Sequence, residues 1–122
     1  MAFQHGFASR IEWYTGILTY LASYGFVVFA GQMYDPDKIL DGVISSAEEA
    51  VLAAQLYDWL TPRVAARTGV QVDATAFGIA GHSRGGKVSW TILKGDPTRA
   101  KAVAGSTRST GPAARKGARR GS

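Results

Sequence analysis

The sequence predicts an α/β fold in which a parallel sheet carries helices on both faces. Short apolar runs near residues 1–4, 26–30, 76–80 and 102–104 have the length of buried strands. The segments that separate these apolar runs carry apolar residues at helical spacing. Such alternation is typical of right-handed crossover units in a parallel sheet. Functional groups are then expected at the carboxyl ends of the strands.

The first helix is expected over residues 9–23. Ser9, followed by Glu12, has the capping-box spacing of a helix start, and Gly25 is a typical helix stop. Its apolar face recurs at three- and four-residue steps: Ile11, Tyr14, Leu18 and Leu21. The strand at 26–30 that follows is apolar throughout, as expected for a strand covered on both faces.

A second helix is expected to begin near Ser45 or Ser46, with Glu48 or Glu49 completing a capping box. One face of this helix is apolar and carries Leu52, Leu56, Trp59 and Leu60. Pro62 then interrupts the helix or starts a further short turn, and Gly69 ends the segment. The strand at 76–80 comes next and leads into a glycine-rich turn.

That turn reads Gly81-His82-Ser83-Arg84-Gly85-Gly86 and precedes a helix expected over residues 87–94. A Gly-x-Ser-x-Gly run between a strand and a helix is the pattern of a nucleophile elbow. The serine stands on a strained turn, and small residues flank it because a Cβ there would collide as the helix folds back over the strand. The start of the helix faces an oxyanion formed at the serine. The alternative is a glycine-rich turn with an idle serine.

Charge and composition narrow the function classes. The net charge of +5 belongs to residues 106–122, which hold five basic and no acidic side chains, whereas residues 1–105 hold nine of each. The body of the chain therefore gives no electrostatic reason to expect nucleic acid. The chain contains no cysteine, and its two histidines have no metal-binding spacing. No apolar run is long enough to span a bilayer.

These motifs resemble a known family. Residues 3–105 are similar to an α/β-hydrolase from its third strand to its sixth, which implies an incomplete three-layer α/β-hydrolase-like sheet. Within that superfamily the run 81–87 resembles the chlorophyllases, as do Phe3-Gln4-His5-Gly6-Phe7 and the run 25–28 leading to Gln32-Met33-Tyr34. Gly31 departs from the family, in which a proline is expected.

The resemblance implies a serine carboxylester hydrolase that cleaves the phytyl ester of chlorophyll. Ser83 would be the nucleophile, and the backbone N–H groups of Phe7 and Arg84 would form the oxyanion hole. The resemblance implies no metal or organic cofactor, a hydrophobic chlorophyll-like ester as substrate, and a chloroplast or cytoplasmic location. Supporting roles around the motif fall to His5, Gly6, Gly81, His82, Gly85 and Gly86.

The remaining triad members are not evident. His5 precedes the serine, whereas the order in this fold is serine, acid, histidine, so His5 is expected to be structural. His82 is expected to pack or hydrogen-bond within the elbow rather than act as base. After Ser83 the sequence holds one acid, Asp96, in a helix-ending turn, and no histidine. The chain is therefore expected to be a fragment with little or no turnover. Marginal folding is expected as well, because a sheet of about four strands without its flanking strands leaves apolar edges and faces uncovered.

The tail suggests a reason. The domain is expected to end at residue 105, with 106–122 a basic, disordered tail. After Gly105, chlorophyllase-like chains usually read Val-Asp-Pro-Val-Asp-Gly-Thr, whose first Asp is the triad acid. One coding of that run, read one nucleotide later, gives Ser-Thr-Arg-Ser-Thr-Gly-Pro, which is residues 106–112. We therefore hypothesise an out-of-frame translation, with Thr107 in the place of the acid.

Three alternatives stay open. The tail is genuine and binds an acidic partner. The chain belongs to another esterase or lipase of the superfamily, acting on lipids or polyesters. The third alternative is a non-catalytic binding protein that uses the pocket of the hydrolase fold together with the basic tail.

Overall fold

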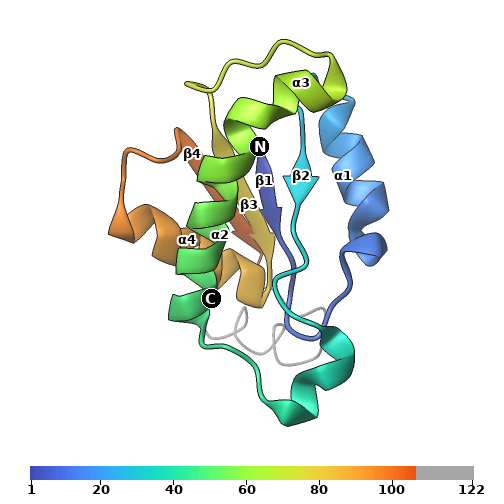
Figure 1. Ribbon diagram of the computed structural model, residues 1–122, viewed down its shortest axis with the longest axis vertical. Helices are drawn as coiled ribbons and strands as arrows, with labels where there is room; N and C mark the ends of the chain where they lie inside the picture. Colours follow the sequence, from blue (N-terminus) through green and yellow to red (C-terminus); the bar gives the residue numbers. More distant parts are fainter. Residues whose placement is uncertain (107–122) are drawn as a thin grey trace, which may run out of the picture.

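The computed structural model describes residues 1–106 of the chain. Its centre is a four-stranded sheet of parallel strands: β1 (Ala2–Gln4), β2 (Phe29–Ala30), β3 (Gly78–His82) and β4 (Ala102–Ser106). The order across the sheet is β2-β1-β3-β4, so β1 and β3 are the central strands. All arrowheads point to one edge, where the start of α4 and the loop after β1 also lie (Figure 1). The predicted parallel α/β architecture is confirmed.

Helices connect the strands. They are α1 (Thr15–Ala22), α2 (Ser46–Leu60), α3 (Val64–Thr68) and α4 (Arg84–Gly95), with the 3₁₀ helices η1 (Ile11–Tyr14), η2 (Pro36–Asp41) and η3 (Thr61–Arg63). The start of α2 is the predicted capping box. Ser45 accepts from the backbone N–H of Glu48, whose side chain reaches back to the N–H of Ser45. Gly69 ends α3 in the left-handed conformation, with a φ of 70°.

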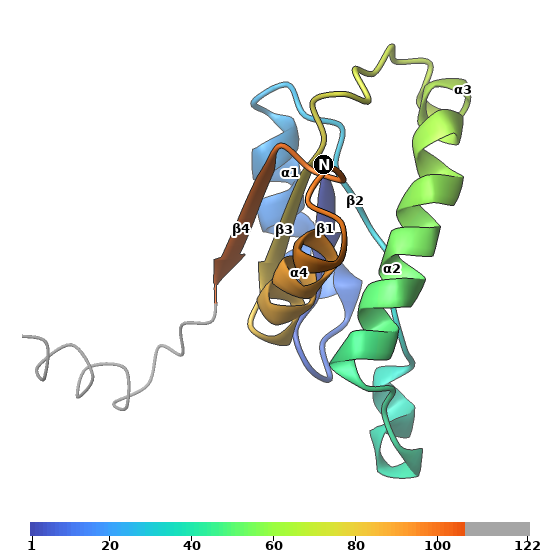
Figure 2. The same ribbon diagram turned by 90° about the vertical axis from the view of Figure 1, so that its left-hand side faces the viewer.

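The helices cover both faces of the sheet. Successive side chains of a strand point to opposite faces. Ala2 belongs to the cluster packed under α2 and α4, whereas the ring of Phe3 points the other way and lies 4.9 Å from that of Tyr14, just before α1. Figure 2 shows α1 and α2 on opposite sides of β1 and β2. These are the three layers that the alternation of elements predicted.

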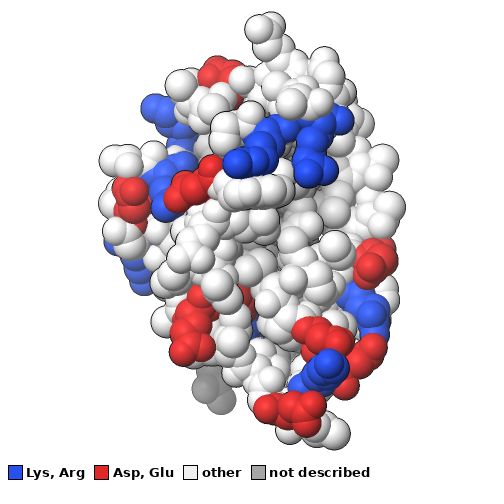
Figure 3. Space-filling view, viewed as in Figure 1, with Lys and Arg blue, Asp and Glu red and all other residues white. Residues whose placement is uncertain are grey.

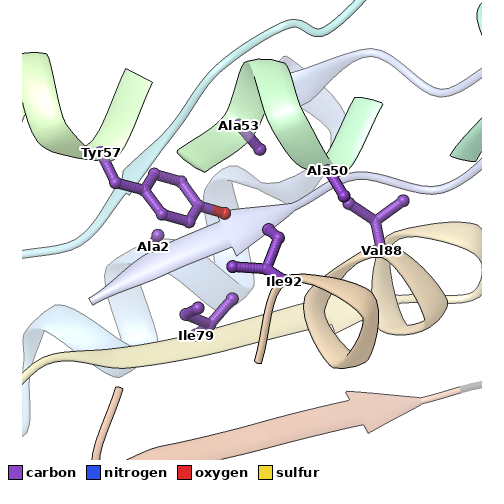
Figure 4. Close-up of a cluster of buried hydrophobic side chains, with 7 residues drawn as sticks. All are labelled: Ala2, Ala50, Ala53, Tyr57, Ile79, Val88 and Ile92. Carbon is purple, nitrogen blue, oxygen red and sulfur yellow. The ribbon is translucent and has the colours of Figure 1, made fainter. Parts of the chain in front are cut away.

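The hydrophobic core lies between the sheet and the helices α2 and α4 (Figure 4). Tyr57 and Ile79 are almost fully enclosed there, with 3% and 1% of their surfaces exposed. The ring of Tyr57 also stacks edge-on against that of Phe29, which extends the core under β2. The buried members of the cluster are Ala2, Ala50, Ala53, Tyr57, Ile79, Val88 and Ile92.

The first helix differs from its prediction. It begins with η1 rather than at residue 9, and no side chain caps it. Ser9 is instead part of the turn before the helix, because its N–H donates to the carbonyl of Gly6 and its hydroxyl to that of Phe7. The predicted Ser9 capping box is therefore wrong. The predicted inward face is right, since its four side chains are half-buried while the intervening ones are exposed: Ile11, Tyr14, Leu18 and Leu21.

The buried face of α2 also differs. Leu52 and Trp59, predicted to point inward, are 44% and 48% exposed. The buried residues of the helix are instead Glu49, Ala50, Ala53 and Tyr57. Alanines fill this face because α2 packs directly against α4, and small side chains allow the two helices to approach closely. Leu56 lies half-buried at the margin of the core.

Three element boundaries shift. β2 is shorter than the expected strand 26–30, since its ladder with β1 begins only at the Ala2–Phe29 pair. β3 starts two residues later than expected, after a turn in which Asp73 accepts from Thr75 and Ala76. Helix α4 begins at Arg84 instead of 87. The strand and helix therefore meet at a single residue, Ser83.

Candidate active site

Ser83 is the single residue between β3 and α4, and its backbone conformation is one that residues with a side chain rarely adopt. Its φ is 55° and its ψ is −119°. Among the described residues, the non-glycine residues with positive φ are Ser83 and Ala8, one in the loop after β3 and one in the loop after β1. Strained non-glycine backbone concentrates at functional sites. Ser83 is exposed, so the turn places this residue at the surface of the described part of the chain.

The glycines around Ser83 are required by close backbone contacts. A Cβ on Gly81 would lie 2.3 Å from the carbonyl carbon and oxygen of Gly85, on the first turn of α4. A Cβ on Gly85 would lie 2.0 Å from the carbonyl oxygen of Gln4, at the end of β1. Real Cβ atoms do not approach backbone this closely, so α4 can pack over β1 and β3 only with glycine at both positions.

Gly86 extends this contact to β4. A Cβ there would meet the Cα of Gly105 at 3.2 Å, and a Cβ on Gly105 would meet the Cα of Gly86 at 3.1 Å. The N–H of Ser83 donates to the carbonyl of Ser106, so the elbow is bonded to the end of β4. Inside the turn, the carbonyl of Ser83 accepts from the N–H of Gly86 at 2.9 Å. Backbone contacts with β1, β4 and the first turn of α4 therefore fix the position of this turn.

The loop after β1 lies directly against this turn. A Cβ on Gly6 would lie 3.1 Å from Nδ1 of His82 and 3.3 Å from its carbonyl oxygen. The next residue, Phe7, is 54% exposed. The N–H groups of Phe7 and Arg84 have no hydrogen-bond acceptor in residues 1–106. Both N–H groups are therefore available as donors on the part of the chain that the structure describes.

His5 is fully buried and supports this loop. Its Nδ1 lies 2.8 Å from the carbonyl oxygen of Gly6, and its Nε2 lies 3.0 Å from the backbone nitrogen of Met33. Since the N–H of Met33 must donate, Nε2 is the acceptor and Nδ1 carries the proton. Both ring nitrogens are therefore occupied by backbone groups, and His5 has no free nitrogen for Ser83.

The His82 side chain is hydrogen-bonded to another element of the chain. Its Nδ1 lies 3.0 Å from the hydroxyl of Tyr14, on the α1 side of the sheet. Asp96, the acid that follows Ser83 in sequence, lies at the opposite end of α4. Twelve helical residues separate them, which corresponds to about 18 Å. Within residues 1–106, no histidine or carboxylate is hydrogen-bonded to the Ser83 hydroxyl.

The Arg84 side chain forms an ion pair that the sequence analysis missed. Its Nε lies 2.8 Å from Oε2 of Glu49, and its NH2 donates to the carbonyl of Ile44 at 2.6 Å. The Glu49 side chain is fully buried, whereas 21% of that of Arg84 is exposed. The sequence suggested Glu48 or Glu49 for the capping box. The structure assigns the cap to Glu48, whereas Glu49 holds the side chain of Arg84, the residue after Ser83.

A second buried group lies beneath β1. The Tyr57 hydroxyl donates to Oε1 of Gln4 at 2.5 Å, and burial raises the pKa of Tyr57, with the charge of Glu49 adding to the effect. Nε2 of Gln4 and Oε1 of Glu49 are buried without a hydrogen-bond partner among the described residues. The only sequence signal for this polar layer was Gln4 within an apolar strand.

In residues 1–106 no three His, Cys, Asp or Glu side chains lie together in a way that could hold a metal ion. No helix of that part is long and apolar enough to cross a membrane. Figure 3 shows basic atoms over the α3 end of one face and both signs elsewhere. Arg63 and Arg67 flank the exposed ring of Trp59 in that area.

Comparisons with known proteins identify the family to which the chain is similar. The family model described as Chlorophyllase matches residues 1–102. Chlorophyllase type 0 of Chenopodium album is 33% identical over 102 residues, covering 78% of this chain and 28% of its own length. Chlorophyllase-2 of Arabidopsis thaliana is 30% identical over 93 residues, covering 72% and 27% respectively. No solved structure gives a significant match.

The chain thus spans little more than a quarter of the length of these curated relatives. The predicted resemblance is confirmed at the level of the family. The four parallel strands of this chain and their helices correspond to part of an α/β-hydrolase fold. The chain belongs to the chlorophyllase family.

Proposed function

We propose that the protein to which this chain belongs is a serine carboxylester hydrolase that converts chlorophyll to chlorophyllide and phytol. The observation that carries the proposal is the exposed Ser83 at a positive φ, with the N–H of Arg84 next to it in sequence and the N–H of Phe7 in the loop packed against the elbow, both without an acceptor in residues 1–106. This is the arrangement needed for a nucleophile with an oxyanion hole. Family membership and the names of the two plant relatives support chlorophyll as substrate.

In the proposed reaction, the Ser83 hydroxyl attacks the carbonyl carbon of the propionate ester. Its proton passes to a general base, and the carbonyl oxygen becomes an anion held by the N–H groups of Phe7 and Arg84. Collapse of the tetrahedral intermediate breaks the bond to the phytyl oxygen, which takes up the proton and leaves as phytol. Water then hydrolyses the acyl-serine to chlorophyllide and free Ser83. The base and its acid come from residues other than those described.

The first test is the nucleotide sequence of the transcript from the Gly105 codon onward. We expect the neighbouring frame to read Asp-Pro-Val-Asp-Gly and to continue to a histidine, with residues 106–122 arising from the shift. Residues 107–122 of this segment lie outside the described residues. A neighbouring frame closed by stop codons would contradict this expectation. The tail would then be genuine, and salt-sensitive binding to an acidic partner would be the function to measure.

The second test is enzymatic. The longest polypeptide that the transcript encodes through Ser83 is assayed on chlorophyll and, in parallel, on a short acyl ester. We expect chlorophyllide release that Ser83→Ala abolishes. Activity on short esters alone would favour a lipid or polyester hydrolase. The 122-residue chain itself should react with a serine-directed phosphonate far more slowly than an intact esterase, since no base contacts Ser83 in the described part.

A further inference from the structure

The hydroxyls of two tyrosines hold the loop that carries Phe7. Tyr14 comes from the end of η1, on the α1 side of the sheet, and Tyr34 follows β2. The N–H of Gly6 donates to the Tyr14 hydroxyl at 2.9 Å, and the N–H of Ala8 donates to the Tyr34 hydroxyl at 2.9 Å. The two hydroxyls therefore take the amides immediately before and after Phe7.

The amides of this loop differ in whether they have a hydrogen-bond acceptor. The N–H of Ser9 closes the turn on the carbonyl of Gly6 at 3.2 Å. Of the four amides of residues 6–9, the N–H of Phe7 alone has no acceptor among the described residues. The left-handed backbone of Ala8, with a φ of 56°, accompanies this turn. The loop thus offers a single available donor, the N–H of Phe7, because the neighbouring N–H groups already donate to other acceptors.

Tyr14 also ties the loop to the elbow. A tyrosine oxygen has one proton and can accept as well. Since the Tyr14 oxygen accepts from Gly6, its own proton is available to Nδ1 of His82, 3.0 Å away. His82 directly precedes Ser83. One hydroxyl therefore joins the backbone of the loop after β1 to the side chain of the residue that precedes Ser83.

Tyr34 makes the second connection. Its hydroxyl lies 3.4 Å from the carbonyl oxygen of Gly6, and its ring lies 5.7 Å beneath the guanidinium of Arg84. The bond from the Met33 amide to His5 fixes the backbone next to Tyr34. Tyr34 thus contacts the loop through its oxygen and the residue after the nucleophile through its ring.

We propose that Tyr14 and Tyr34 are positioning residues that set the distance between the two donors of the oxyanion hole and reserve the Phe7 N–H for the developing anion. The inference rests on the proposed function for its catalytic consequence only. Neither tyrosine touches the reacting atoms. Each acts by occupying a competing amide and by joining the loop after β1 to the elbow.

The direct test is amide hydrogen exchange, followed by NMR, in the 122-residue chain. Tyr14→Phe and Tyr34→Phe keep the rings and remove the hydroxyls. We expect Tyr14→Phe to speed exchange of the Gly6 amide about tenfold and Tyr34→Phe to do so for the Ala8 amide, with Phe7 fast throughout. The control is Tyr20→Phe on α1, whose hydroxyl contacts only that of Tyr24 among the described residues. The amide of Ile79 in β3 reports that each variant is folded.

The proposal is overturned if both variants leave Gly6 and Ala8 unchanged, or if the Phe7 amide is as protected as its neighbours. The catalytic consequence is measured in the longest polypeptide encoded through Ser83. There we expect kcat to fall about tenfold with KM unchanged in each variant, because the oxyanion forms only in the transition state. A Ser83-dependent esterase whose kcat is unaffected overturns the positioning role. Absence of any Ser83-dependent activity instead refutes the proposed function, while the exchange data still decide whether the tyrosines hold the loop.

Discussion

Gly85 lies against the end of β1 so closely that a Cβ added to it would meet the carbonyl oxygen of Gln4 at 2.0 Å. Both groups are backbone, so neither can move without separating α4 from the sheet. We expect Gly85→Ala to lower the free energy of unfolding by about 3 kcal/mol, as forced overpacking does. Urea denaturation followed by circular dichroism measures this change.

The matched control for Gly85→Ala is Gly95→Ala, at the other end of α4. A Cβ on Gly95 has no atom within 4 Å, and its φ is not positive. Alanine is the better helix former there, so no loss of stability is expected. Equal effects of the two substitutions would show that the contact with β1 is not what requires glycine.

Strained backbone at the site has a measurable cost. Ser83 and Ala8 both have positive φ, a conformation that costs about 1–3 kcal/mol for a residue with a side chain. Glycine relieves this strain but loses more chain entropy on folding, which offsets part of the gain. We therefore expect Ser83→Gly and Ala8→Gly each to raise the free energy of unfolding by a net amount of about 1 kcal/mol. Ser83→Ala retains the Cβ and should leave stability unchanged. A loss of stability in both glycine variants would argue against strain at these turns.

The ion pair between Arg84 and Glu49 gives a third prediction. Glu49 is fully buried, so removing its partner leaves an uncompensated charge. We expect Arg84→Met to cost about 3 kcal/mol, and the double variant Arg84→Met with Glu49→Leu to recover most of it. Asp58→Asn, which breaks an exposed pair with Arg99, should cost less than about 1 kcal/mol. A double variant no more stable than Arg84→Met would contradict the prediction.

Tyr57 predicts a dependence on alkaline pH. Burial raises its pKa in the folded state above the unfolded value of about 10. The folded state therefore binds the phenolic proton more tightly, and stability is complete below pH 10 and falls as the pH rises further. Urea denaturation between pH 8 and 11 measures this fall, and Tyr57→Phe should make it shallower. Identical pH profiles for the two proteins would contradict the role of Tyr57.

The sequence predicted well what depends on local pattern. Helical spacing identified the inward side of α1, and the spacing of Ser45 and Glu48 identified the start of α2. The strand–serine–helix pattern placed Ser83 at the junction of β3 and α4. Each of these features is determined by residues adjacent or one helical turn apart.

What escaped prediction depends on contacts between distant segments. The inward face of α2 was missed because close packing on α4 selects Ala50 and Ala53 over larger side chains. Glu49 was missed because its burial makes sense only once Arg84, 35 residues later, lies beside it. The hydroxyls of tyrosines carry no periodic signal, although a buried tyrosine usually finds a partner for its oxygen.

The bond from the N–H of Ser83 to the carbonyl of Ser106 joins main chain to main chain. Any amino acid at position 106 presents the same carbonyl, so the support that β4 gives the elbow is insensitive to the side chain there. Gly105, by contrast, admits no larger residue without pressing on Gly86. Mutational tolerance should therefore differ between these two neighbouring codons, with substitutions at 106 accepted more readily than substitutions at 105, where α4 must shift by a few tenths of an ångström.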